Sequence, residues 1–140
     1  MAHLLMYTDC LDLEGIVSSP SYGSGNREEI LRMIDLYEKD LPKLSEHIKG
    51  LMSPAELRAI TKQGRKGAAP YRGFLTPTEG SRWIVQCARR QDERPLWISV
   101  WGGLDDVAQA FTMRLTLLTK SVSTGLEVLT KSGVLTVMPI

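Results

Sequence analysis

The junction around Gly102 and Gly103 holds the residue types that a ligand site at the end of a strand requires. An apolar run, Leu96–Trp101, precedes the two glycines, and Asp105 and Asp106 follow them at the start of an expected helix. Ligands in open α/β sheets bind beyond the carboxyl ends of the strands, where glycine permits close approach and helix amides point toward the ligand. The same spacing also suits an ordinary tight turn with an aspartate as helix cap, which is the more common case.

A second group with chemical potential is the set of carboxylates near the first expected strand, Asp9, Asp12 and Glu14. Three carboxylates close together could hold a metal ion or carry out acid–base catalysis. Strand alternation directs Asp12 and Glu14 to the same face, just ahead of a buried segment. We therefore expect both side chains to be solvated at the entrance of that strand.

The remaining polar residues give weaker signals. His3 and His47 are far apart and have no partner at the spacing of metal ligands, so we expect surface or half-buried positions. The segment Gly64–Gly73 is basic and rich in glycine, and a solvated loop explains it better than a nucleic-acid surface does. Nothing in the sequence matches the glycine patterns of nucleotide-binding loops.

Composition limits the classes of function. The chain has 140 residues, 43% of them hydrophobic, which suits one domain or part of one. The formal net charge of +1 shows no excess of basic residues, so we expect neither a nucleic-acid nor a membrane partner. Cys10 and Cys87 are too few for a disulfide framework or a four-cysteine metal site. No stretch has the form of a signal peptide or the length of a membrane span.

Helices and strands alternate along the first half of the sequence. Met1–Tyr7 has the pattern of the end of a helix, and Leu11–Val17 that of a buried strand that leads into a loop of serine and glycine. Asn26 and Ser53 have the form of helix caps, and Pro42 is expected to kink or divide the first of these helices.

The second half continues the alternation. Thr76–Gly80 opens a further helix, and Leu104 begins another after the two glycines. Between them, Leu96–Trp101 is typical of a parallel strand that helices cover on both faces. The pattern predicts an α/β fold in which this strand and one near residues 13–18 lie parallel in one sheet.

Three stretches of the chain resemble a known family. They are Met1–Ser19, Thr78–Val85 and Arg94–Ala110, of which the last includes Pro-Leu-Trp-Ile-Ser-Val-Trp-Gly-Gly followed by Ala-Gln-Ala. Together they are similar to the nucleoside-hydrolase-like proteins of bacteria and fungi that are sometimes labelled cellulose-binding. The resemblance covers most of residues 1–111. It implies a Rossmann-like parallel sheet with crossover helices, here as an incomplete nucleoside hydrolase fold.

The resemblance also implies a site. In the wider nucleoside hydrolase superfamily, one calcium ion at the strand ends activates a water that attacks the anomeric carbon of ribose. Its ligands come mainly from an Asp-rich motif immediately ahead of the helix that here begins at Met1, and that motif is absent from this sequence. A further ligand, a backbone carbonyl, would fall at or beside Trp101. The loop that would contact the sugar holds Ser18, Ser19 and Ser21.

Two of the three resulting hypotheses concern catalysis. The first is a fragment of a nucleoside-hydrolase-like protein that binds no calcium and has no activity by itself, although its parent would act on a nucleoside or another glycoside. The second is a complete small enzyme with substitute carboxylates at Asp9, Asp12, or Asp105 and Asp106. The missing motif favours the first hypothesis, and relatives commonly have a small polar pair in place of Asp105 and Asp106.

The third hypothesis is a carbohydrate-binding module or another non-catalytic α/β domain. Trp83, Trp97 and Trp101 would be the platforms on which sugar rings stack. Trp97 and Trp101 share one face of a strand that we expect to be buried, so core packing is the better explanation for these two rings.

Composition changes abruptly at Thr112–Ile140, where Thr, Leu, Val and Ser dominate and Glu127 is the only acidic residue. The resemblance ends at the same place, and codons read one base earlier permit a string similar to the family's next helix and strand. We interpret residues 112–140 as an out-of-frame tail that is poorly ordered or loosely attached. The alternative is a native strand pair, Leu126–Leu129 and Val134–Met138.

Overall fold

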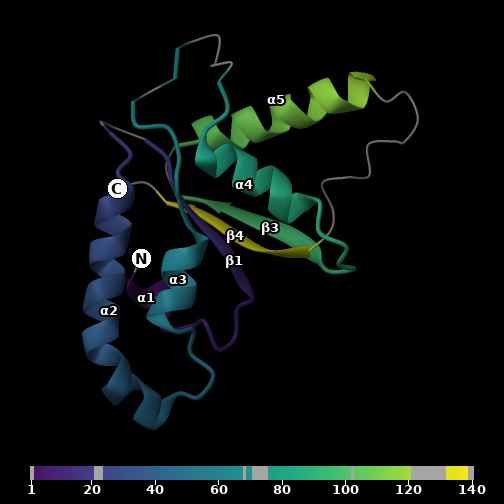
Figure 1. Cartoon of the computed structure of the whole chain (residues 1–140). Coiled ribbons are helices and arrows are strands. Elements are labelled where there is room, and N and C mark those ends of the chain that lie inside the picture. Colours follow the sequence, from purple (N-terminus) through teal and green to yellow (C-terminus); the bar gives the residue numbers. More distant parts are fainter. Residues whose placement is uncertain are drawn as a thin grey trace.

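A computed structural model of the chain has a four-stranded parallel sheet with helices on both faces (Figure 1). It describes residues 2–20, 24–67, 69–70, 76–101, 103–120 and 132–138. In chain order the elements are α1 (Ala2–Leu5), β1 (Leu13–Ser18), α2 (Arg27–His47), α3 (Pro54–Ile60), β2 (Thr61–Gln63), α4 (Glu79–Ala88), β3 (Pro95–Val100), α5 (Asp105–Lys120) and β4 (Ser132–Met138). None of the helices described is long and apolar enough to cross a membrane.

The strands follow one another across the sheet in the order β2-β1-β4-β3, and every neighbouring pair is parallel. Val17 of β1 and Val100 of β3 both pair with Val137 of β4, so the carboxyl ends of these strands lie level. The prediction that β1 and β3 lie parallel in one sheet is therefore confirmed. β2 was not expected, because three residues after a helix leave no alternation to detect.

The predicted caps form as the side-chain chemistry requires. The Asn26 Oδ1 atom accepts a hydrogen bond from the Glu28 backbone N–H at 3.1 Å and starts α2. Ser53 and Thr78 both form capping boxes, at the starts of α3 and α4. Pro42 lies inside α2, which continues from Arg27 to His47 as one helix.

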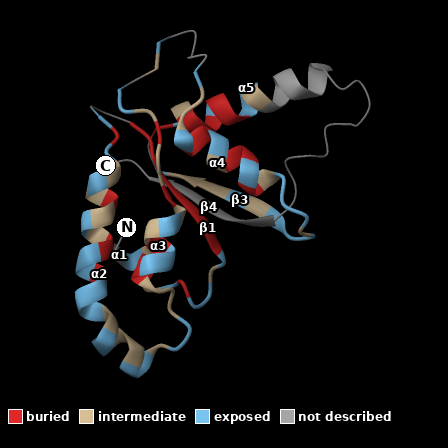
Figure 2. Ribbon diagram, in the orientation of Figure 1, coloured by how far each residue is buried: buried red, intermediate tan, exposed pale blue. Residues whose placement is uncertain are grey.

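Two apolar clusters fix the helices to opposite faces of the sheet. The first face carries α1, α2 and α3, and its buried residues are Leu5, Leu13, Ile16, Ile30, Ile34, Tyr37 and Leu57. The second face carries α4 and α5, and its buried residues are Val17, Ile84, Val85, Val107 and Ala110. β1 is buried on both faces and forms the centre of the fold (Figure 2).

β3 is covered on one face only, which corrects the expectation of a strand buried on both. Leu96, Ile98 and Val100 pack toward the cluster beneath α4 and α5. Trp97 and Trp101, on the opposite side, are 67% and 54% exposed. The reason is topological: α2 and α3 pack over β1 and β2, while β3 lies at the far edge of the sheet.

Part of the tail contributes to the sheet. α5 continues past Phe111 to Lys120, and Val134–Met138 lies within β4, between β1 and β3. The other expected strand, Leu126–Leu129, lies outside the described residues. β4 pairs with β1 and β3, while the out-of-frame origin and the loose attachment of residues 112–140 both stay predictions.

Candidate functional site

The carboxyl ends of β1 and β2 meet the start of α5 at what we call the strand-end edge, formed by Ser18, Ser19, Gly64, Gly103 and Asp106. The Gly64 backbone N–H donates to the Ser18 carbonyl oxygen at 2.9 Å. A Cβ atom on Gly64 would lie 2.2 Å from that oxygen and 2.3 Å from Asp106 Oδ2. A Cβ atom on Gly103 would lie 1.8 Å from the Pro20 carbonyl oxygen. Both glycines therefore permit the contacts that bring these segments together.

Asp106 is fully buried and acts as a hydrogen-bond acceptor for segments outside its own helix. Its carboxylate accepts from the Arg65 backbone N–H at 3.0 and 3.2 Å and from the Thr78 hydroxyl. Asp105 accepts from the Ala69 backbone N–H at 2.8 Å. The two aspartates thus hold the loop after β2 through hydrogen bonds, and Asp106 also bonds to Thr78, the N-cap residue of α4. These hydrogen bonds go beyond a simple helix cap, and a ligand site at this turn stays a prediction.

The predicted sugar-contacting serines lie at the same edge. Ser18 and Ser19 are fully buried, and their hydroxyl oxygens have no hydrogen-bond partner among the described residues. Ser21 lies outside the described residues. A buried hydroxyl without a partner is costly, so these two groups are suited to a hydrogen bond with a ligand hydroxyl or an ordered water.

Gln63 is a member of this region that sequence reasoning missed. Its side-chain oxygen accepts from the Arg27 backbone N–H at 2.9 Å, and its amide donates to the Gly25 and Gly64 carbonyl oxygens at 3.1 and 3.0 Å. Gln63 therefore joins the end of β2 to the start of α2. No local pattern in the sequence indicates Gln63, because the three-residue strand β2 is too short to be recognised.

Trp101, the predicted source of a carbonyl ligand, follows the end of β3 on the far side of β4. Since Val17 and Val100 pair with the same residue of β4, the ends of β1 and β3 are separated by one strand, or about 10 Å. The Trp101 indole N–H donates to the Ser99 hydroxyl, and the ring is exposed. Gly102 lies outside the described residues.

The calcium ion that the resemblance implies does not fit the carboxylates present. Across the described residues, no three His, Cys, Asp or Glu side chains gather closely enough to hold a metal ion. At the strand-end edge, Asp105 and Asp106 already accept hydrogen bonds from backbone amides. Calcium requires six to eight oxygen ligands, so the donor set at this edge is inadequate.

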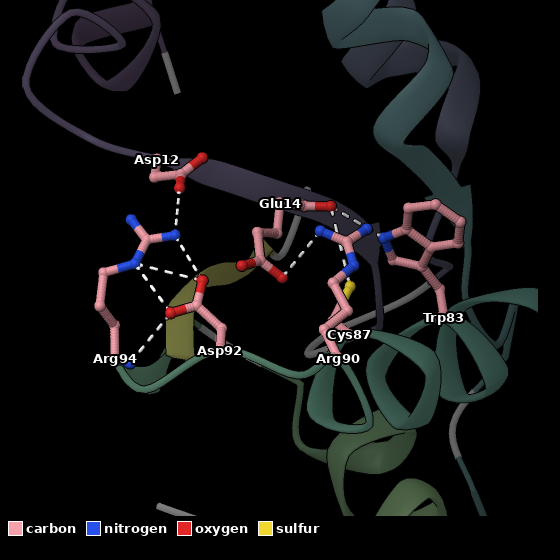
Figure 3. A network of polar contacts seen from close by, with 7 residues as sticks. All are labelled: Asp12, Glu14, Trp83, Cys87, Arg90, Asp92 and Arg94. Atoms are coloured by element: carbon pink, nitrogen blue, oxygen red, sulfur yellow. Dashed lines mark hydrogen bonds and ion pairs between the residues drawn. The ribbon is translucent and has the colours of Figure 1, made fainter. Parts of the chain in front are cut away.

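Asp12 and Glu14, two of the predicted carboxylates, lie at the opposite end of β1, in the network of Figure 3. Asp12 is exposed, as expected, and pairs with Arg94 at 2.7 Å. Glu14 is buried, which corrects the expectation of a solvated side chain, and its Oε2 lies 3.1 Å from Arg90. The alternation argument failed because α4 ends over this face and Arg90 pairs with the buried charge.

The surroundings of Glu14 make this network structural. The Trp83 indole N–H donates to the Glu14 carbonyl oxygen at 3.0 Å, and Trp83 also lies beside Lys62, whose Nζ is 4.3 Å from the ring centroid. Burial raises the pKa of the Glu14 carboxyl, against the opposing charge of Arg90. Burial likewise raises the pKa of the Cys87 thiol to about 11, so the reactive thiolate is scarce at neutral pH.

The chain is similar to a known protein family over most of its length. The family model described as cellulose-binding Sde182, nucleoside hydrolase-like domain, matches residues 1–133. The chain belongs to this family. The match extends beyond Phe111, where we expected the resemblance to end. No curated protein shows a significant match.

A solved structure supports membership in the nucleoside-hydrolase-like family. It is a nucleoside hydrolase-related hypothetical protein from Saccharophagus degradans, described as associated with carbohydrate metabolism. The TM-score is 0.71 and the sequence identity 28%. The similarity covers 88% of this chain and 30% of that one, so the chain spans less than a third of that protein's length.

Proposed function

We propose that this chain is a non-catalytic portion of a nucleoside-hydrolase-like domain that does not hydrolyse N-glycosyl bonds by itself. The hydrogen bonding of Asp106 is the observation that carries the proposal. Calcium-assisted hydrolysis needs oxygen ligands turned toward the ion and a carboxylate base turned toward water. Asp106 is instead buried and directed at the Arg65 backbone N–H and the Thr78 hydroxyl.

In this proposal, the strand-end edge supplies the part of the site that would contact the sugar. Ser18 and Ser19 present buried hydroxyls suited to a glycoside, and Gly103 keeps the turn after β3 close to them. A longer parent would supply the carboxylates of the calcium site and act on a nucleoside or another glycoside. This portion would supply the sheet and the edge.

Ribose release tests the proposal. The purified chain is incubated with calcium and with inosine or a nitrophenyl riboside, beside an active nucleoside hydrolase as positive control. We expect no ribose above the buffer blank. Release that a chelator abolishes, and that is lost in Asp106→Ala but kept in Asp40→Ala at an exposed position of α2, would overturn the proposal.

A second candidate function is saccharide binding on β3. Trp97 and Trp101 lie on one face of the strand and are largely exposed, contrary to the core role expected from the sequence. Exposed aromatic rings on a flat strand can stack against sugar rings. Trp83, the third candidate platform, is instead held by the Glu14 carbonyl oxygen and by Lys62.

Retention on insoluble cellulose tests this second function. Removing one stacking ring is worth about 0.5–1.5 kcal/mol, so Trp97→Ala or Trp101→Ala should weaken binding roughly two- to tenfold. Tyr7→Ala is the matched control, because Tyr7 is another exposed aromatic side chain but lies before β1, away from β3. Equal retention of all the variants would remove the tryptophans from consideration.

A further inference from the structure

Two ion pairs tie the α4–β3 connection, residues 89–94, to the start of β1 (Figure 3). Arg90 reaches the Glu14 carboxylate, with its Nη1 atom 3.1 Å from Oε2. Arg94 reaches the Asp12 carboxylate at 2.7 Å. Because Asp12 and Glu14 are two residues apart, both ion pairs join this connection to the same end of β1.

The two carboxylates differ in burial. The Glu14 side chain is 6% exposed, whereas that of Asp12 is 58% exposed and lies in water. Water and salt screen the exposed pair, so it contributes little to holding the connection. A buried carboxylate is costly while it is charged and needs a cationic partner. Arg90 is the partner that supports the ionised form of Glu14 in the folded chain.

The side chain of Arg90 has few other attachments. Its backbone N–H donates to the Cys87 carbonyl oxygen at 3.1 Å, but its side chain is 44% exposed. The guanidinium carbon lies 5.8 Å from the centre of the Trp83 ring, near the outer limit of a cation–π contact. The charge of Glu14 is therefore the main attraction that keeps the guanidinium over β1, and the half-exposed side chain can turn to water.

Other charged and titratable groups surround Glu14 from each element packed against it. Among the described residues they are, besides Arg90, Asp12 ahead of β1, Cys87 on α4, Asp92 and Arg94 in the connection, and Lys62 of β2, which lies against the Trp83 ring. Burial raises the pKa of the Glu14 carboxyl, and the charges of Asp12 and Asp92 raise it further, against the charge of Arg90. Glu14 thus takes up a proton at a higher pH than an exposed glutamate does.

We propose that Glu14 and Arg90 form a proton-controlled latch, in which the ionised carboxylate holds the α4–β3 connection against β1 and the protonated carboxyl releases it. One proton from solvent removes the negative charge that attracts Arg90, and neutral Glu14 no longer needs a buried cation. Arg90 then turns to water, while the Arg94 pair with Asp12 does not depend on Glu14. The latch goes beyond the proposed function and does not rest on the absence of hydrolysis.

NMR on the full chain from pH 4 to pH 8 tests the latch. The Cδ resonance of Glu14 reports its protonation, and the order parameters of the backbone amides 89–92 report whether the connection is held. We expect one midpoint for both signals, with order parameters of roughly 0.85 above it and less than about 0.6 below it. The amides of β1 and β3 should stay rigid throughout, because the strands do not separate.

Three variants separate the latch from a general effect of pH. Glu14→Gln has no charge at any pH, so its amides 89–92 should have the low order parameters even at pH 7. Asp12→Asn is the matched control, because it removes the exposed carboxylate at the same end of β1 and should keep the transition. Arg90→Met removes the cation but keeps an apolar stem, and it should move the midpoint of Glu14 upward.

Three results would overturn the latch. The first is protonation of Glu14 in the native chain without a change in the amides 89–92. The second is a rigid connection in Glu14→Gln at pH 7, and the third is loss of the transition in Asp12→Asn. The native titration is informative even if a variant fails to fold.

Discussion

At the residue scale, the buried carboxylate of Asp106 holds the strand-end edge together. It accepts hydrogen bonds from the Arg65 backbone N–H and the Thr78 hydroxyl in the absence of solvent. Asp106→Ala should lower the free energy of unfolding in urea by about 1–3 kcal/mol, because buried donors lose their acceptor. Asp40→Ala, at an exposed position, should change it by less than about 0.5 kcal/mol. Equal effects of the two substitutions would contradict this role.

Glu14 predicts a pH dependence of stability. Burial holds the pKa of its carboxyl above the ordinary value of 4.5, so in the window above 4.5 the folded chain binds more protons than the unfolded chain. Stability from this group is present below that window and is lost as pH rises through the folded-state pKa. Urea unfolding from pH 4 to pH 8 should therefore show the native chain losing stability relative to Glu14→Gln. A constant difference between the two proteins across this range would be the contrary result.

The sequence was sufficient to predict the positions of some of these residues but not their contacts. Ser18 and Asp106 could each be placed near the carboxyl end of an expected parallel strand, Ser18 after the first and Asp106 after the second. The hydrogen bonds of Asp106 could not, because Arg65 and Thr78 come from segments whose approach depends on the whole fold. The burial of Glu14 was unpredictable for the same reason, since its partner Arg90 lies beyond α4.

At the element scale, we expect the proline inside α2, Pro42, to lower the stability of that helix. Pro42 is exposed, lacks a backbone N–H and cannot bond to the Glu38 carbonyl oxygen one turn earlier. Pro42→Ala restores that donor, and we expect the free energy of unfolding to rise by about 1–2 kcal/mol after the greater flexibility of the unfolded chain is allowed for. Lys43→Ala is the neighbouring control, with an expected change near zero. A loss of stability in Pro42→Ala would show that the proline has a structural role.

Element boundaries were predictable where a side chain marks them. Asn26, Ser53 and Thr78 cap their helices through their own oxygen atoms, so local sequence was sufficient. The burial of β3, in contrast, could not be predicted from its local sequence. Its apolar run predicted burial on both faces, but Trp97 remains exposed because the helices of the first face lie over other strands.

At the scale of the whole molecule, residues 112–140 raise the question of whether this tail is translated in the reading frame of the family. We predict that the transcript across the Phe111 codon, read one base earlier beyond that point, encodes a continuation similar to the family's next helix and strand. Sequencing the transcript measures this directly. A one-base-earlier reading without that continuation would end the out-of-frame interpretation.

We propose that the strand-end carboxylates of this nucleoside-hydrolase-like chain are structural acceptors and not calcium ligands. Thermal unfolding with calcium or with chelator tests it most directly, because an ion that binds only the folded chain raises the Tm with its concentration. We predict the same Tm in both conditions, and a lower but equally calcium-insensitive Tm for Asp106→Ala. A saturable rise in Tm with calcium that Asp106→Ala abolishes would contradict the claim.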